Sequence, residues 1–283
     1  MKSIEDTYKL NNGLEIPCVG YGTFNTPDEE VEKAVLTALE IGYKHVDTAF
    51  LYANEVGIGK AIKKCGIPRE ELFITSKLWN TNRGYESTKE AFKITLNNLG
   101  LEYLDLYLVH WPANRLQFGD EAKKINADTW RAMEELYEEG YVKAIGVSNF
   151  LTHHLEELME GAKIKPMVNQ IEFHPGWLQE DTVKYCKDQN IIIEAWSPLG
   201  RNEILENDNL IKVADKYNKS TAQLCIRWIL QKGILPLPKS VTPSRIKENT
   251  EVFNFVIEEE DMQFIDSLQF IGGRCVDSDT VPF

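Results

Sequence analysis

Two groups able to move a proton lie five residues apart in the stretch HVDTAFLYANE. Asp47 and Tyr52 stand where a strand-like apolar run gives way to a helix-like one, and Lys77 and His110 close two other apolar runs. A tyrosine with a pKa near 10 is a weak match for proton transfer at neutral pH, but a cation within about 4 to 6 Å lowers that pKa. We therefore predict that Lys77 lowers the pKa of Tyr52, that Asp47 anchors Lys77, and that a carbonyl oxygen accepts a hydrogen bond from the imidazole.

This set of groups predicts general acid catalysis, in which Tyr52 protonates an oxygen while another agent supplies hydride. A bound metal is not expected, because Asp47 and His110 alone do not make a tetrahedral site and no H-E-x-x-H is present. His153 and His154 are expected on a polar helix face. Serine hydrolysis is not expected either, because the sequence contains no G-x-S-x-G turn. A Schiff-base aldolase that uses Lys77 as its amine is a further alternative.

Eight short, β-rich apolar runs recur along the chain, each followed by a stretch of helical spacing. The runs are 19–22, 45–49, 72–77, 104–111, 144–149, 167–172, 191–197 and 234–239. Between two of them, Trp130, Met133, Leu136 and Tyr137 form one apolar stripe, and Gly140 stands where the helix should end. Eight such units without a linker predict a single (β/α)₈ TIM barrel domain over residues 1–283.

Three further features complete the predicted architecture. Residues 8–10 and 14–16 flank an Asn-Asn-Gly turn and predict an N-terminal β-hairpin. Residues 258–268 predict an extra C-terminal helix, and the segment after it is expected to lie over the mouth of the barrel or to fray as a terminus. A doubly wound sheet is the alternative, but GYGTFN lacks the third glycine of its dinucleotide motif.

Polar residues stand at the carboxyl end of seven of the eight predicted strands. They are Asp47, Lys77, His110-Trp111, Ser148-Asn149, Asn169-Gln170, Trp196-Ser197 and Lys239-Ser240. Each alone has a structural explanation, such as a helix cap or a hydrogen-bonded loop residue. Their recurrence at the same end of successive strands predicts one active-site mouth, because catalytic groups of a TIM barrel come from that end.

Composition limits the partners of this chain of 283 residues. A formal net charge of -13 opposes generic binding to nucleic acid or to an anionic membrane. The five cysteines are scattered and odd in number, which fits reduced thiols, and no signal peptide or membrane span is apparent. We expect a cytoplasmic monomer that acts on a small molecule.

Seven ordered motifs resemble those of the aldo-keto reductases, from about Gly22 to Asn249. They are DTAFLYANE, ITSKLWN, DLYLVHWP, AIGVSNF, MVNQIEFHP, AWSPLG and LPKSVTPSRIKEN. Phe24 and Trp196 stand where many members carry Trp and Tyr, and the turn SPLGRNEIL is short. These features resemble the bacterial branch that includes 2,5-diketo-D-gluconate reductases and prostaglandin F synthase-like enzymes.

The resemblance implies reduction of aldehydes and ketones to alcohols with NADPH, and with NADH less readily, on a tetrad of Asp47, Tyr52, Lys77 and His110. The cofactor-binding positions it implies are Gly22, Thr23, Phe24, Asp47, Ser148, Asn149, Gln170, Trp196, Ser197, Leu199, Lys239, Ser240, Val241, Thr242, Arg245, Glu248 and Asn249. Substrate contacts would come from Phe24, Tyr52, Trp79, His110, Trp111 and the tail after Leu268. Some relatives of this fold act instead as cofactor-binding sensors or regulatory subunits with weak catalysis, and that alternative stays open.

The NADPH preference depends on the strand-to-helix junction KSVTPSRIKEN. Lys239 and Arg245 supply two cations, and Pro243 fits the first turn of a helix with Thr242 as its N-cap. In the family, the matching positions hold the adenosine 2′-phosphate. On an acidic chain, a local basic cluster is what such an anion requires.

Overall fold

The computed structural model describes all residues, 1–283, and is built around a ring of parallel strands. Eight strands pair in sequence order. They are β3 (Gly20–Gly22), β4 (His45–Asp47), β5 (Phe73–Leu78), β6 (Leu106–Val109), β7 (Ile145–Ser148), β8 (Val168–Glu172), β9 (Ile192–Trp196) and β10 (Leu235–Pro236). The Gly22 N–H donates to the Pro238 carbonyl at 3.0 Å and joins the two ends of the sheet. The predicted barrel is confirmed.

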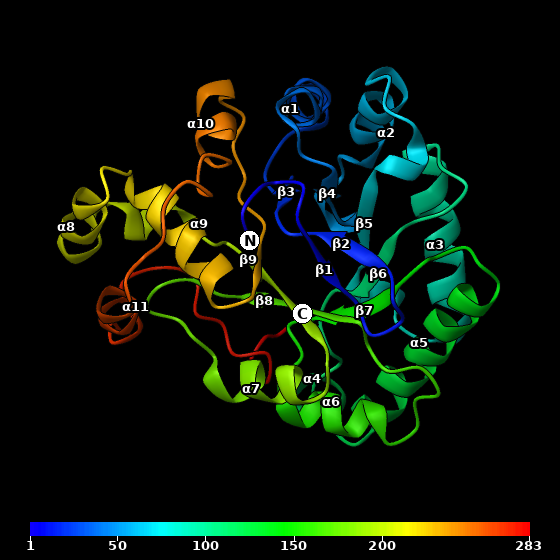
Figure 1. The fold of residues 1–283 in the computed structure, drawn as a ribbon. Helices are drawn as coiled ribbons and strands as arrows, with labels where there is room; N and C mark the ends of the chain where they lie inside the picture. Colours follow the sequence, from blue (N-terminus) through cyan, green and yellow to red (C-terminus); the bar gives the residue numbers. More distant parts are fainter.

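Helices surround this ring on the outside (Figure 1). They are α1 (Asp28–Ile41), α2 (Glu55–Lys64), α3 (Tyr85–Leu99), α4 (Arg115–Phe118), α5 (Glu121–Glu138), α6 (Thr152–Met159), α7 (Glu180–Asp188), α8 (Asp208–Lys216), α9 (Thr221–Gln231), α10 (Pro243–Glu248) and the predicted extra helix α11 (Glu259–Asp266). Helix α1 shows why they form: Val31, Val35 and Leu39 are buried on one face, and Gly42 ends the helix with φ 117°.

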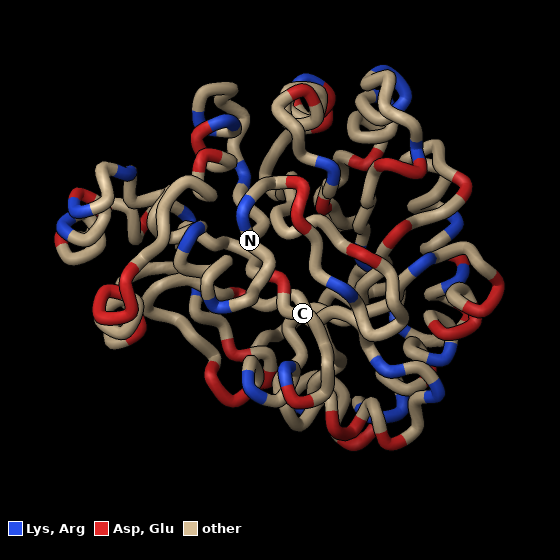
Figure 2. Tube along the Cα trace, in the orientation of Figure 1, with Lys and Arg blue, Asp and Glu red and all other residues tan.

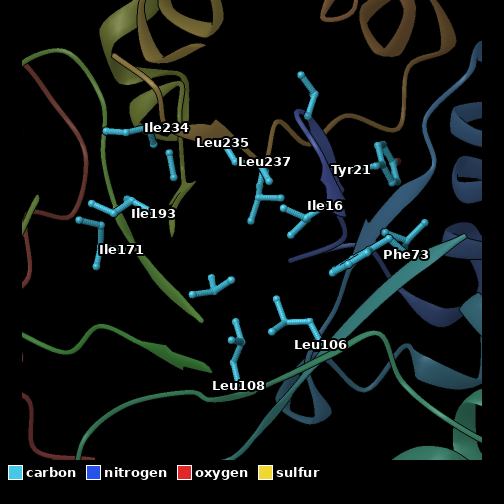
Figure 3. Close-up of a cluster of buried hydrophobic side chains, with 14 of the residues drawn as sticks. Ile16, Tyr21, Phe73, Leu106, Leu108, Ile171, Ile193, Ile234, Leu235 and Leu237 are labelled. Atoms are coloured by element: carbon cyan, nitrogen blue, oxygen red, sulfur yellow. The ribbon is translucent and has the colours of Figure 1, made fainter. Parts of the chain in front are cut away.

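The predicted hairpin, β1 (Thr7–Lys9) with β2 (Glu15–Pro17), closes one end of the ring. Ile16 is fully buried and lies inside the ring with Leu106 and Leu237 (Figure 3). Burial of such side chains contributes about 1.5–3 kcal/mol each. Because apolar residues fill this end, the cavity opens at the carboxyl ends of the strands.

Two strands are each four residues shorter than the predicted runs. The run 234–239 keeps only Leu235 and Pro236 as strand, because Pro236 and Pro238 have no N–H to donate. Within the run 104–111 the strand spans only Leu106–Val109, with an isolated bridge between Leu104 and Val142 before it, and His110 and Trp111 lie on the loop that follows.

Charged residues of both signs lie mainly on the outer helices and loops (Figure 2). No helix has both the length and the apolar character needed to cross a bilayer. The charges inside the ring are therefore exceptional, and they belong to the site described next.

Candidate active site

A cavity of about 460 Å³ opens at the carboxyl ends of the strands. This volume lies within the range of small-molecule sites. The predicted residues that line it are Gly22, Thr23, Phe24, Asp47, Tyr52, Trp79, His110, Trp111, Ser148, Asn149, Gln170, Trp196, Ser197, Leu199 and Lys239. The structure thus brings the five individually predicted substrate contacts to one cavity, together with most of the predicted cofactor contacts.

Lys77 lies beneath the cavity floor and connects Asp47 to Tyr52. Its ammonium donates to Asp47 Oδ2 at 2.7 Å, to the Thr48 carbonyl at 2.9 Å and to Tyr52 Oη at 3.4 Å. Strands β4 and β5 are neighbours, so Asp47 and Lys77 can meet across them. The short 3₁₀ turn Phe50–Tyr52 then returns the phenol over the cavity.

Lys77 lowers the pKa of Tyr52 as predicted, but the prediction left out the larger effect of burial. Burial raises the pKa of Tyr52 above its ordinary value, and this outweighs the opposing effect of the Lys77 ammonium. For Lys77, burial lowers the pKa, but the Asp47 carboxylate and Tyr52 raise it more, so the net direction is upward. At neutral pH the phenol therefore holds its proton and the amine stays charged, as a general acid beside a cation requires.

His110 faces the same cavity as a neutral imidazole. Burial, with the charges of Lys77 and Arg83, holds its pKa well below the ordinary value. Its Nδ1 is buried without a hydrogen-bond partner, and the side chain lines the cavity. The His110 and Tyr52 rings meet edge to face at 5.9 Å, so both can reach one oxygen atom.

Three polar residues, Ser148, Asn149 and Gln170, also line the cavity. Asn149 donates to the His110 carbonyl at 2.9 Å and accepts from the Trp196 indole at 2.8 Å, which fixes the orientation of that ring. The Ser148 hydroxyl donates to the backbone carbonyl of Gln170 at 2.7 Å. Trp196 thus presents a flat, oriented aromatic face to the cavity.

Six of the predicted cofactor residues lie outside the cavity lining. They are Ser240, Val241, Thr242, Arg245, Glu248 and Asn249. These residues follow β10 or belong to α10, where Pro243 occupies the first turn as predicted and Thr242 is the N-cap without a side-chain capping bond. Arg245 is exposed and forms no ion pair, and Lys239 Nζ donates only to the Asn25 carbonyl, at 3.3 Å. Two cations without anionic partners thus stand at one rim.

Several lining residues were not predicted. They are Asn25, Leu51, Pro198, Arg201, Asn202 and Leu237, whereas Arg274, Val276 and Phe283 belong to the tail that was expected over the mouth. Most belong to loops, whose course depends on contacts that periodicity does not reveal.

The C-terminal tail reaches the cavity, which confirms the expected tail over the mouth. Asn114 donates to the carbonyls of Ser278 and Val281, both at 2.9 Å. Phe283 stacks on Trp79 at 6.0 Å between centroids and meets Trp111 edge-on at 5.3 Å. Phe283 therefore forms part of the cavity wall.

Replacing Phe283 with alanine is expected to raise KM for bulky aromatic carbonyls by about 5- to 20-fold, the worth of one or two aromatic contacts. kcat for a two-carbon substrate should change by less than about twofold, because Tyr52 and His110 are untouched. Phe270→Ala is the matched control: the residue lies in the same tail but contacts Trp177 instead of the cavity. Equal KM changes in both variants would contradict a role for Phe283 in the wall.

The prediction that His153 and His154 share a polar helix face is wrong for His154, which is buried. Both Nε2 atoms lie 3.1 Å from Asp279 Oδ1 in the tail. His154 Nδ1 accepts from the Leu151 N–H at 3.2 Å, so its proton resides on Nε2, which lies 3.1 Å from Asp279 Oδ1. A metal ligand needs the reverse tautomer. The cluster therefore fits a hydrogen-bonded anchor for the tail.

Fold and cavity together define a (β/α)₈-barrel protein with proton-transfer groups at its mouth. The sequence profile of the Aldo/keto reductase family matches residues 18–269. The chain therefore belongs to the aldo/keto reductase family, a class of oxidoreductases, as its motifs predicted.

Individual family members are similar to this chain over nearly their whole length. The chain is 51% identical to "Glyoxal reductase" of Bacillus subtilis (strain 168), over 94% of each protein. It is 49% identical to "9,11-endoperoxide prostaglandin H2 reductase" of Trypanosoma cruzi (strain CL Brener), over 92% of this chain and 90% of the relative. A crystal structure of a Gox0644 variant in complex with NADPH superposes with a TM-score of 0.91, 39% identity and 99% coverage of both chains.

Proposed function

We propose that the protein reduces aldehydes and ketones to alcohols with NADPH, and that Tyr52 is the proton donor. The observation that carries the proposal is the buried Asp47–Lys77–Tyr52 chain, which ends with a protonated phenol in the cavity beside a neutral His110. The bound cofactor would supply hydride.

The residues present fit that cofactor in two places. At the inner end, Trp196 offers a fixed aromatic face, with Ser148, Asn149 and Gln170 around it. At the rim, Lys239 and Arg245 are cations without anionic partners, as a phosphate would require. Both groups of residues are also the positions that the family uses for its cofactor.

Each residue of the tetrad would then have one task. His110 Nε2 and Tyr52 Oη hydrogen-bond the carbonyl oxygen and orient it. As negative charge develops there, Tyr52 transfers its proton, and the Lys77 ammonium stabilises the phenolate that remains. Asp47 holds Lys77 in place at 2.7 Å.

Reactive aldehydes and α-dicarbonyls are the substrate class we propose. The cavity wall of Phe24, Trp79, Trp111 and Phe283 is apolar and aromatic, and the similar Bacillus subtilis protein is named for glyoxal. A panel of aldehydes, ketones and α-dicarbonyls, followed at the NADPH absorbance band, tests this directly. NADPH binding without turnover on any member of the panel would support a sensor in place of an enzyme.

Removing the rim cations should change cofactor preference more than turnover. We expect Lys239→Met with Arg245→Leu to lower kcat/KM for NADPH by about 100-fold and kcat/KM for NADH by less than about threefold, because charge-assisted hydrogen bonds to a phosphate would be lost. Lys247→Met on the same helix is the control, since Lys247 pairs with Glu251 on the surface. A double variant that retains the wild-type preference would contradict the assignment.

A further inference from the structure

Glu194 is a fully buried acid inside the ring of strands that no predicted role includes. It lies on β9, where Gln170 of β8 is its partner in the strand register. Trp196, two residues further along the same strand, lines the cavity. Because side chains alternate along a strand, Glu194 points to the same interior, one layer below.

One amide connects Glu194 to the tetrad. Gln170 Nε2 donates to Asp47 Oδ1 and to Glu194 Oε2, both at 2.8 Å. Both hydrogens of the amide are thereby used, and a flipped amide would set its carbonyl oxygen against the Asp47 carboxylate. Glu194 and Asp47 together therefore fix the orientation of the Gln170 amide. Its side-chain oxygen is the atom that remains free to contact a ligand.

Charged and titratable groups face Glu194 from other strands of the ring: Asp47 and His45 of β4, and Lys77 of β5. Burial, followed by the Asp47 charge, raises the pKa of Glu194 to about 8, while Gln170 and Lys77 oppose the rise. Burial and Lys77 lower the pKa of His45 to about 3, so His45 is neutral. His45 Nε2 lies 3.8 Å from Glu194 Oε1, which has no hydrogen-bond partner.

His45, Thr75 and Glu194 form a polar layer inside the ring, and the neighbouring backbone leaves room for it. Gly20 of β3 faces His45, and an added Cβ there would lie 2.6 Å from His45 Nδ1 and 2.4 Å from Leu237 Cδ2. Barrel interiors are usually filled by branched apolar side chains. At neutral pH the layer of His45, Thr75 and Glu194 carries no net charge, so Asp47 alone balances Lys77.

We propose that Glu194 is a positioning residue for the reduction: its neutral carboxyl holds Gln170 against Asp47, and its ionisation adds a second negative charge beneath Lys77 that weakens Tyr52 as an acid. This inference rests on the proposed function, because it acts through Tyr52. Negative charge near a phenol raises the phenol's pKa, and a weaker acid transfers its proton more slowly. The turnover rate therefore falls as Glu194 loses its proton.

The pH profile of kcat tests this role. In the wild type, kcat for an aldehyde is expected to fall about three- to tenfold between neutral pH and pH 9.5, the effect of about one pKa unit on Tyr52. Glu194→Gln, which has the same shape and cannot ionise, should abolish that alkaline loss. Glu134→Gln, a buried acid of α5 that accepts from the Lys163 and Ile164 N–H groups, should retain it.

Stability supplies a readout that needs no turnover. Folded Glu194 keeps its proton up to about pH 8, whereas the unfolded chain loses it near the ordinary value of 4.5. The unfolded state then binds fewer protons between these values, so the free energy of unfolding decreases as pH rises through the window. Glu194→Gln should remove this decline, and Glu134→Gln should not.

Infrared spectroscopy of the wild type tests whether the Glu194 carboxyl is protonated. This measurement does not depend on whether the Glu194→Gln variant folds. A protonated-carboxyl band at neutral pH that disappears on alkaline titration supports the proposal, and absence of the band overturns it. An active wild type whose alkaline loss persists in Glu194→Gln overturns the positioning role alone. A wild type that reduces no carbonyl overturns the proposed function, and this role with it.

Discussion

Tyr52→Phe is expected to lower kcat for carbonyl reduction by about 10²–10⁴-fold, the usual contribution of a positioned general acid. The variant loses one hydroxyl that lies 3.4 Å from the Lys77 ammonium. Its ring still packs against Phe24 and His110, at 5.0 and 5.9 Å between centroids, so the cavity keeps its shape. KM for the carbonyl should change far less than kcat, because the missing group acts mainly in the transition state. Steady-state rates from NADPH absorbance measure both.

Tyr8→Phe is the matched control for Tyr52→Phe. Its hydroxyl donates to the Ile234 carbonyl at 3.3 Å and belongs to the hairpin strand β1, outside the cavity. Removing it should leave kcat within about twofold. If Tyr52→Phe also kept kcat within about twofold of the wild type, Tyr52 would not be the proton donor.

Lys77→Met should damage both stability and turnover. The Lys77–Asp47 pair is almost wholly buried, with side chains 1% and 6% exposed. Loss of the cation leaves the Asp47 carboxylate without its charge partner, and breaking a buried pair typically costs about 3–5 kcal/mol. Denaturant unfolding measures this loss, and kcat should fall with it because a phenolate at Tyr52 would no longer be stabilised.

Two variants isolate the cause of the Lys77→Met effect. Lys44→Met breaks a surface pair with Glu71, whose side chains are 39% and 56% exposed, and should cost no more than about 1 kcal/mol. Adding Asp47→Asn to Lys77→Met removes the stranded charge and should restore part of the stability without restoring turnover. A Lys77→Met cost no larger than that of Lys44→Met would show that the buried pair contributes little.

Much of the fold could be predicted because barrel elements repeat local patterns. Each apolar run became a strand and each apolar stripe, such as that of α1, became a helix, since these periods reflect burial on one side. The polar strand ends also indicated the cavity, because parallel strands bring the same end of each run to one mouth. Strand lengths near prolines and the loop residues of the wall could not be read this way.

Sequence reasoning indicated three buried titratable groups least: Glu194, His154 and the protonation of Tyr52. Glu194 has a signal, an acid at an inward-facing position of an apolar strand, but its partner Gln170 is distant in sequence. His154 follows helical spacing onto a buried face, and only the tail residue Asp279 explains it. The pKa direction of Tyr52 depends on how deeply the phenol is buried, a property of the folded cavity.

Isotope transfer is the most direct test of hydride delivery in this cavity. The wild-type protein would be mixed with glyoxal and NADPH deuterated at both C4 positions, and the alcohol product analysed by mass spectrometry. We expect one deuterium on the carbon that carried the reduced carbonyl, and product formation about 100-fold slower or more in Tyr52→Phe. A product without deuterium, or no product from any carbonyl of the panel, would contradict the proposed reduction.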